Sequence, residues 1–157
     1  MVRKVEIMDT TLRDGEQTSG MSFSSSEKLT IAKLLLEELK VDRIEIASAR
    51  VSDGEFTAVK NITNWAKEND YLNKVEVLTF LDNGVSINWL SESGAKVQNL
   101  LTKGSFNHLK YQIRKTPKEH FNDVYNSVYE ARKLNIDTNV YLEDWSNGMR
   151  NSPRQLT

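Results

Sequence analysis

The sequence contains no cysteine among its 157 residues, and only two histidines, His108 and His120. Disulfide bonds, thiolate metal ligands and a cysteine nucleophile are therefore excluded, so any metal must be held by oxygen or by histidine. Prolines number only two and glycines seven, and they form no linker that would divide the chain. We expect a single domain over residues 1–157, which is long enough to bury one core.

The chain also lacks a strong charge and a long apolar run. Its 21 Lys and Arg residues face 22 Asp and Glu residues, giving a formal charge of −1. No basic block is long enough to follow a nucleic acid, and no apolar run approaches the roughly 20 residues that span a bilayer. We therefore expect a soluble protein without nucleic-acid or membrane partners. We also expect it to be cytoplasmic, because the N-terminus leads into a strand and not into a signal peptide.

Short apolar or alternating segments recur along the chain and predict five strands. Alternation places Ile44 and Ile46 on one face of a strand and Arg43 and Glu45 on the other. The predicted strands cover residues 5–8, 43–47, 74–79, 96–101 and 137–143.

Helices are predicted between these strands. Ser24 and Glu27 have the spacing of a capping box, which starts a first helix of about sixteen residues. Further helices are predicted over residues 54–69 and 85–92, and another begins at Thr116 and Pro117. The apolar face expected for the first helix consists of Leu29, Ala32, Leu35, Leu36 and Leu39, and that of the last consists of Phe121, Val124, Tyr125, Val128, Ala131 and Leu134.

Strands that alternate with helices predict an α/β fold with a parallel sheet, either doubly wound or a barrel. Polar side chains alternate with aliphatic ones at residues 43–47 and 139–143, as in barrel strands that carry functional groups inward. A closed eight-stranded barrel needs about 250 residues, so five units cannot close it. We predict an N-terminal partial barrel of about five βα units from the (β/α)8 TIM-barrel class.

The most informative segment is residues 9–17, with the sequence Asp-Thr-Thr-Leu-Arg-Asp-Gly-Glu-Gln, followed by Lys28. It places an arginine, carboxylates and an amide directly after an apolar strand. Asp14 is a hard oxygen ligand suited to Mg²⁺ or Mn²⁺, and Arg13 can grip a carboxylate or polarise a carbonyl. The segment therefore predicts a site for a metal and an oxo-acid.

This motif resembles the signature of the metal-dependent barrel family that contains 2-isopropylmalate, homocitrate and citramalate synthases, with hydroxymethylglutaryl-CoA lyase as a relative. The resemblance implies that Arg13 contacts a 2-oxo acid, that Asp14 binds a divalent metal (Mg, Mn or Zn), and that Gln17 lies against the same site. It also implies that Glu45 and Glu143 line the substrate pocket, Glu143 with a catalytic role. For both glutamates, an interior ion pair or a barrel-packing carboxylate is the alternative.

The function that the resemblance implies is a Claisen-type condensation of acetyl-CoA with a 2-oxo acid in amino-acid biosynthesis, by a homo-oligomer. Two features depart from the family. Residues 139–141 read Asn-Val-Tyr where the synthases commonly have Arg-x-Ser, and the late His-x-His metal pair is absent, since His108 and His120 lie outside such a motif. The isolated chain is therefore expected to be inactive. Alternatives are lyase chemistry on a hydroxyacyl-CoA and a non-catalytic, self-associating half-barrel.

Overall fold

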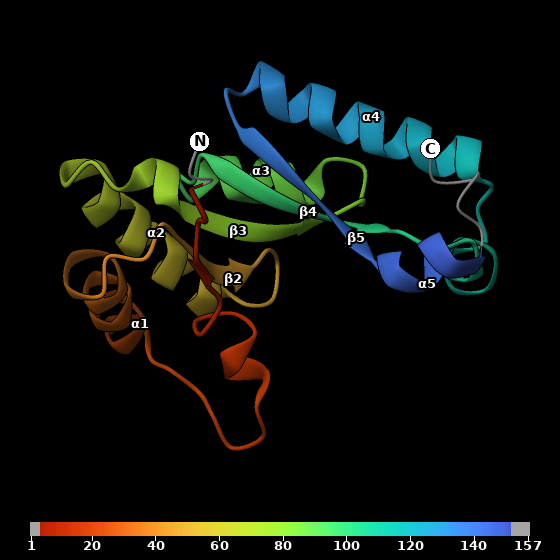
Figure 1. Cartoon of the computed structure of the whole chain (residues 1–157). Coiled ribbons are helices and arrows are strands. Elements are labelled where there is room, and N and C mark those ends of the chain that lie inside the picture. The colour runs from red at the N-terminus through yellow and green to blue at the C-terminus, as the bar shows by residue number, and fades with distance from the viewer. Residues whose placement is uncertain (1–3, 152–157) are drawn as a thin grey trace.

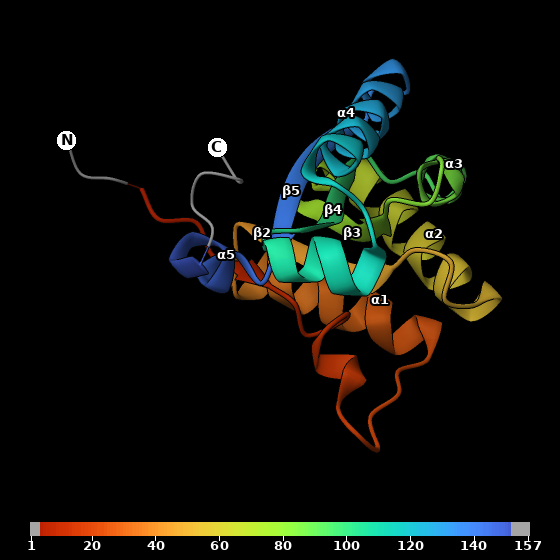
Figure 2. The ribbon, with the colours of Figure 1, turned by 90° about the vertical axis from the view of Figure 1, so that its right-hand side faces the viewer.

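The computed structural model describes residues 4–151 and shows five parallel strands joined by helices (Figure 1). The strands pair in chain order, and every neighbouring pair is parallel. In Figure 2, α1 to α4 run from below the sheet, round one side, to above it, and on the opposite side lie only α5 and the N-terminal segment. The predicted half-barrel is thus confirmed. The strands are β1 (Met8–Asp9), β2 (Arg43–Ser48), β3 (Val75–Phe80), β4 (Val97–Lys103) and β5 (Asp137–Glu143).

Four of the five predicted strands are confirmed, with ends that shift by a residue or two, but the first is wrong. β1 covers only Met8–Asp9, and Val5 and Ile7 are 80% and 63% exposed. Before β1 the chain is held by single contacts and not by a ladder: the Ile7 N–H donates to the Asp42 carboxylate at 2.9 Å. Only Met8 and Asp9 pair with β2, so the strand is limited to these two residues.

The first helix begins as predicted but does not keep a straight face. α1 (Ser25–Lys33) starts with the capping box of Ser24 and Glu27, and continues into the π-helical turn η2 (Leu34–Glu38). The wider turn rotates the positions that follow it. Leu36 is buried, but Leu39 is 72% exposed, so its predicted place in the core is wrong.

The main core lies between the outer face of the sheet and the first three helices. Ile44, Ile46, Val75 and Val77 point outward from β2 and β3 and are fully buried. They pack against α2 (Asp53–Glu68) and α3 (Val85–Glu92), both close to their predicted positions. The remaining short helices are η1 (Gly15–Gln17), η3 (Leu72–Lys74), η4 (His108–Ile113) and α5 (Trp145–Asn151).

The prediction that α4 (Pro117–Lys133) buries its apolar face is wrong. The helix begins at the predicted Thr116 and Pro117, but Phe121 and Tyr125 are 67% and 60% exposed, and of the predicted stripe only Ala131 is fully buried. β5, the outer strand of the half-barrel, likewise leaves Val140 45% exposed. Within residues 4–151, no element covers these neighbouring apolar surfaces. None of the helices in that range is both long and apolar enough to cross a membrane.

Candidate active site

The signature loop follows β1 and folds back on one carbonyl group. The Thr10 carbonyl oxygen accepts hydrogen bonds from the backbone N–H groups of residues 13–15, at distances of 3.1, 2.8 and 3.1 Å. Leu12 is fully buried and anchors the loop in the core. The same turn leaves Arg13 partly buried and the Asp14 side chain 60% exposed. The loop therefore presents these two side chains together at the carboxyl edge of the sheet.

Lys28 fixes the signature loop against the helices. Its ammonium group lies 2.5 Å from the Glu16 carboxylate and 2.5 Å from the Glu55 carboxylate, and donates to the Leu12 carbonyl at 3.2 Å. Glu16 also accepts the Phe23 N–H at 2.9 Å. Lys28 is only 1% exposed, so this cation is fully engaged inside the protein. The lysine of the signature thus holds the loop in place.

A buried ion pair orients Arg13. Its Nε donates to Oε2 of Glu45 at 2.5 Å, and its Nη1 donates to Oδ1 of Asp14 at 2.9 Å. Glu45 is fully buried in β2, and its second oxygen accepts a hydrogen bond from Asn99 Nδ2 at 2.7 Å. Both glutamate oxygens are therefore satisfied, which holds the guanidinium in one orientation.

The hydrogen-bond network continues across the inner face of the sheet. Asn139 Nδ2 on β5 donates to Asn99 Oδ1 at 3.0 Å and to Glu76 at 3.2 Å, and Arg43 Nη1 donates to Glu76 at 3.1 Å. Two buried carboxylates are thus each matched by one arginine and linked by two amides. Sequence reasoning did not identify Asn99 or Glu76, although alternation on their strands carries the signal.

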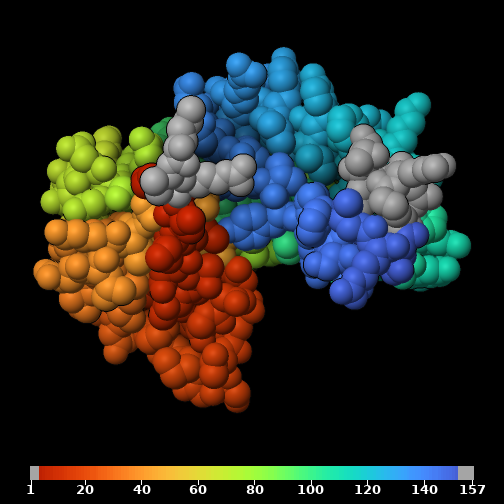
Figure 3. Space-filling view, viewed as in Figure 1, coloured from red at the N-terminus to blue at the C-terminus, as the bar shows by residue number. Residues whose placement is uncertain are grey.

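Tyr141 on β5 reaches across the open face. Its hydroxyl lies 3.4 Å from the Met8 sulfur on β1. Burial, together with the nearby carboxylates of Glu45 and Glu76, raises the pKa of the Tyr141 phenol. One side chain of the first strand and one of the last therefore meet beside the polar network. Figure 3 shows the recess between the N-terminal segment in red and the β5–α5 segment in blue.

Gln17 shares a hollow with Arg13. The hollow has a volume of about 310 Å³ and lies between the signature loop and the loop after β2. Gln17 is exposed, so its amide is accessible from this hollow. The structure therefore brings Arg13 and Gln17 to one opening. Its other lining residues are Leu12, Glu16, Ser22, Ala47, Ser48, Val51, Ser52 and Glu55.

Glu143 lies at the same edge of the sheet, but on the outermost strand. It ends β5 and forms an ion pair with Lys103, which ends β4. Its side chain is 39% exposed. Among the described residues it forms no hydrogen bond or ion pair with Arg13, whose partners are Glu45 and Asp14. The structure therefore does not gather all of the predicted site residues into one cluster.

Asp14 is the predicted metal ligand, and within residues 4–151 no three His, Asp or Glu side chains lie close enough to hold a metal ion. One Asp14 oxygen accepts from Arg13, and the side chain is 60% exposed to solvent. Its chemistry fits one hard oxygen ligand of an incomplete set.

The two histidines do not contact Arg13, Asp14 or Glu45 through any hydrogen bond or ion pair among the described residues. His120 is only 7% exposed: its Nε2 accepts the Lys103 N–H at 3.2 Å, and burial lowers the pKa of its imidazole. His108 Nε2 lies 3.7 Å from the Asp144 carboxylate, in the loops after β4 and β5. Both side chains therefore support the loops that follow the last two strands.

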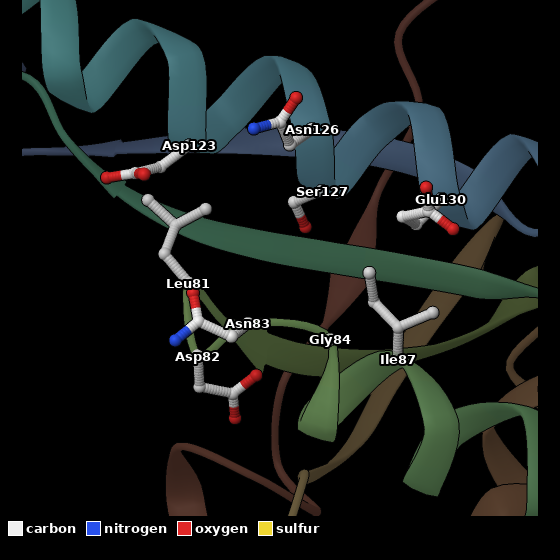
Figure 4. A pocket seen from close by; sticks show the side chains of 9 residues that line it. All are labelled: Leu81, Asp82, Asn83, Gly84, Ile87, Asp123, Asn126, Ser127 and Glu130. Atoms are coloured by element: carbon white, nitrogen blue, oxygen red, sulfur yellow. The ribbon is translucent and has the colours of Figure 1, made fainter.

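A second hollow, of about 240 Å³, lies on the helical side, between the loop after β3 and α4 (Figure 4). Three carboxylates line it, but each is already paired with a cation, which leaves no free charge for a ligand. The pairs are Asp82 with Arg50 at 2.8 Å, Asp123 with Lys115 at 2.5 Å and Glu130 with Lys133 at 2.8 Å.

The sequence is similar to those of two synthases. The chain is 37% identical to a 2-isopropylmalate synthase of Pyrococcus furiosus over 144 residues, which cover 92% of the chain and 28% of that protein. It is 37% identical to the (R)-citramalate synthase of Methanocaldococcus jannaschii over 140 residues, covering 89% and 27%. The chain thus spans less than a third of the length of either relative.

The fold is similar to that of a solved structure, the HMG-CoA lyase of Bacillus subtilis. The TM-score is 0.58 at 23% identity, and the match covers 88% of this chain and 46% of that one. The model of the HMGL-like family matches residues 4–152. On this match and the synthase relatives, the chain belongs to the HMGL-like family.

Proposed function

We propose that the chain supplies part of the active site of an acyltransferase that joins the acetyl group of acetyl-CoA to a 2-oxo acid. The reaction would be a Claisen-type condensation followed by thioester hydrolysis, in cytoplasmic amino-acid biosynthesis. The observation that carries this proposal is the buried Arg13–Glu45 pair beside the exposed Asp14. The similarity to proteins named as 2-isopropylmalate and (R)-citramalate synthases supports the same class of reaction.

Arg13 would bind the 2-oxo acid. Its Nε and Nη1 are engaged by Glu45 and Asp14, and within residues 4–151 its Nη2 donates no hydrogen bond. A guanidinium held in this way offers fixed donors to a carboxylate or to an oxygen on which negative charge develops. Gln17, at the same hollow, would add an amide donor. The pair would thus both position the acid and stabilise its charge.

Asp14 would be one oxygen ligand of a divalent metal, Mg²⁺, Mn²⁺ or Zn²⁺. Such a metal, when bound, polarises the carbonyl of the 2-oxo acid. Asp14 accepts one hydrogen bond from Arg13, which aligns the carboxylate beside the group that binds substrate. We propose that the other ligands belong to a part of the enzyme outside this sequence, because the sequence has no His-x-His pair.

Glu143 would act further along the edge. The ion pair with Lys103 holds its carboxylate at the end of β5, where it is partly exposed. From there it could orient the acyl group or assist proton transfer, since a carboxylate is a suitable proton acceptor at a developing carbanion. Glu45, in contrast, has both oxygens engaged by Arg13 and Asn99, so its role is to position Arg13.

The test is thiol release from acetyl-CoA by the enzyme that contains this sequence, with a 2-oxo acid and a divalent metal. The absence of cysteine from these 157 residues keeps their background with a thiol-specific dye low. We expect Asp14→Asn to abolish metal-dependent release. The control is Asp70→Asn, which changes an exposed aspartate away from the hollow. Unchanged turnover in Asp14→Asn would refute the proposal.

A further inference from the structure

The segment that joins β4 to α4 has an unusual charge. Residues 103–118 contain five Lys and Arg residues and no Asp or Glu. The rest of the sequence therefore holds the other 16 cations and all 22 carboxylates of the chain. We call residues 103–118 the basic segment. A local excess of cations of this size attracts anionic ligands, although the protein as a whole is almost neutral.

Most of these cations have no carboxylate partner. Two of the five are neutralised, Lys103 by Glu143 and Lys115 by Asp123. The other three are exposed and form no ion pair with any residue in the range 4–151. These three are Lys110, Arg114 and Lys118.

An exposed aromatic ring lies among these cations. Tyr111 in η4 is 70% exposed, and the Lys110 ammonium lies 5.0 Å from the centre of its ring. Beside the ring is an open depression of about 490 Å³, lined also by Asn107, His108 and Gln112. A flat ring next to amide groups and a cation suits a heteroaromatic base that carries phosphates.

The basic segment is also continuous with the candidate active site. It starts at Lys103, which pairs with Glu143, and the next N–H group, of Gly104, donates to the Glu143 carbonyl at 2.7 Å. A side chain at Gly104 would lie 3.0 Å from the Trp145 backbone, so the close approach of the two loops requires glycine. Figure 2, viewed toward the carboxyl ends of the strands, shows η4 in front of the sheet.

We propose that the basic segment binds the nucleotide end of the acyl-CoA co-substrate, with its phosphates on Lys110, Arg114 and Lys118 and its adenine on Tyr111. This inference rests on the proposed function. An acyl-CoA carries its thioester at one end of a flexible arm and a phosphorylated adenosine diphosphate at the other. With the thioester near Glu143, a surface that accepts the distant anionic end should follow along the same edge.

Calorimetric titration of coenzyme A into the 157-residue chain at low ionic strength tests this binding without any catalysis. We expect saturable binding, competition by 3′,5′-ADP, and weaker binding of dephospho-CoA, which lacks the 3′-phosphate. The double variant Lys110→Gln, Lys118→Gln should bind about fivefold more weakly, as expected for two exposed ion pairs. Tyr111→Leu should weaken coenzyme A binding but leave pyrophosphate binding unchanged.

The matched control is Lys60→Gln, Lys67→Gln, which removes the same charge from two exposed positions on α2. It should bind coenzyme A as the parent chain does. Absence of binding by the parent chain, an unchanged affinity in the Lys110 and Lys118 variant, or an equal loss in the control would each overturn the inference.

Failure of the proposed function has a different outcome. Coenzyme A would still bind through the basic segment, but no 2-oxo acid would trigger thiol release. If the function is correct and the inference is wrong, thiol release would occur with a KM for acetyl-CoA that the Lys110 and Lys118 variant does not change.

Discussion

Replacing Lys28 by methionine should lower the free energy of unfolding by about 3 to 5 kcal/mol, because it breaks a buried ion pair from one side. Lys28 is 1% exposed, and its ammonium group forms ion pairs with two carboxylates and donates a hydrogen bond to the Leu12 carbonyl. Without it, Glu16 and Glu55, whose side chains are 20% and 16% exposed, would face each other with no cation between them. Methionine can fill the volume but cannot neutralise either charge.

Urea denaturation followed by circular dichroism measures this loss. For a small domain the slope of the unfolding free energy is about 1 to 3 kcal/mol per molar urea, so the midpoint should fall by about 2 M. Lys60→Met is the control: Lys60 is exposed on α2, and the change should stay within about 0.5 kcal/mol. Domains usually have a total stability of about 5 to 15 kcal/mol, so a parent chain above about 7 kcal/mol leaves the Lys28 variant folded in buffer.

A loss below about 1 kcal/mol would refute the reasoning, because it would show that the two carboxylates turn to solvent without cost. A second variant separates charge from packing. Adding Glu16→Gln and Glu55→Gln to Lys28→Met removes the uncompensated charges and should restore most of the stability. If stability stayed low, the cause would be the shape of the methionine, and the ion pair would not be what holds the signature loop.

Two further predictions concern pH and association. Burial lowers the pKa of the His120 imidazole, although the nearby Asp123 charge acts in the opposite direction, so the unfolded state binds more protons than the folded state. The free energy of unfolding should therefore fall as the pH drops below about 6.5. In urea titrations at pH 7.5 and 5.5, His120→Gln should make this dependence on pH smaller. The exposed apolar surfaces of α4 and β5, including Phe121, Tyr125 and Val140, should make the isolated chain self-associate, and light scattering that shows a monomer over a wide concentration range would contradict this.

The sequence predicts the fold well for the four longer strands, including β5, which pairs with one neighbour only. In β2, alternation correctly separates outward Ile44 and Ile46 from inward Glu45. The same rule fails for residues 5–8, since strand length depends on the neighbour and not on the apolar run. The helical period fails for Leu39, because a 3.6-residue period does not detect the π-helical turn η2 that precedes it.

The apolar stripe of α4 shows a different limit. Periodicity predicts that a helix has an apolar face, but not which element covers it. Phe121 and Tyr125 have the right spacing and are nevertheless exposed in the described part of the chain. His120, which lies off the predicted stripe, is buried because its imidazole accepts the Lys103 N–H. A specific hydrogen bond across 17 residues is invisible to any pattern of hydrophobicity.

The candidate site also contains residues that the sequence predicts and contacts that it does not. Arg13, Asp14 and Gln17 could be predicted because they are close in sequence and their chemistry is distinctive. Glu45 was also predicted, as a pocket residue with an interior ion pair as the alternative, but its pairing with Arg13 and the contribution of Asn99 could not be, because these residues meet only after the sheet has formed. Sequence separation of 32 and 54 residues hides the contacts that give the arginine its direction.

The signature motif therefore combines two physical requirements in one string of residues. Arg13 and Asp14 need a turn that places Arg13 at the hollow and leaves Asp14 exposed, and that turn must be held without using either side chain. Glu16 and Lys28 meet this need: Lys28 lies in the first turn and a half of α1, where its inward-facing position reaches Glu16, Glu55 and the Leu12 carbonyl at once. The spacing between the glutamate and the lysine is thus set by how α1 packs against the loop, and a change in that spacing should disturb the site even if every polar side chain is kept.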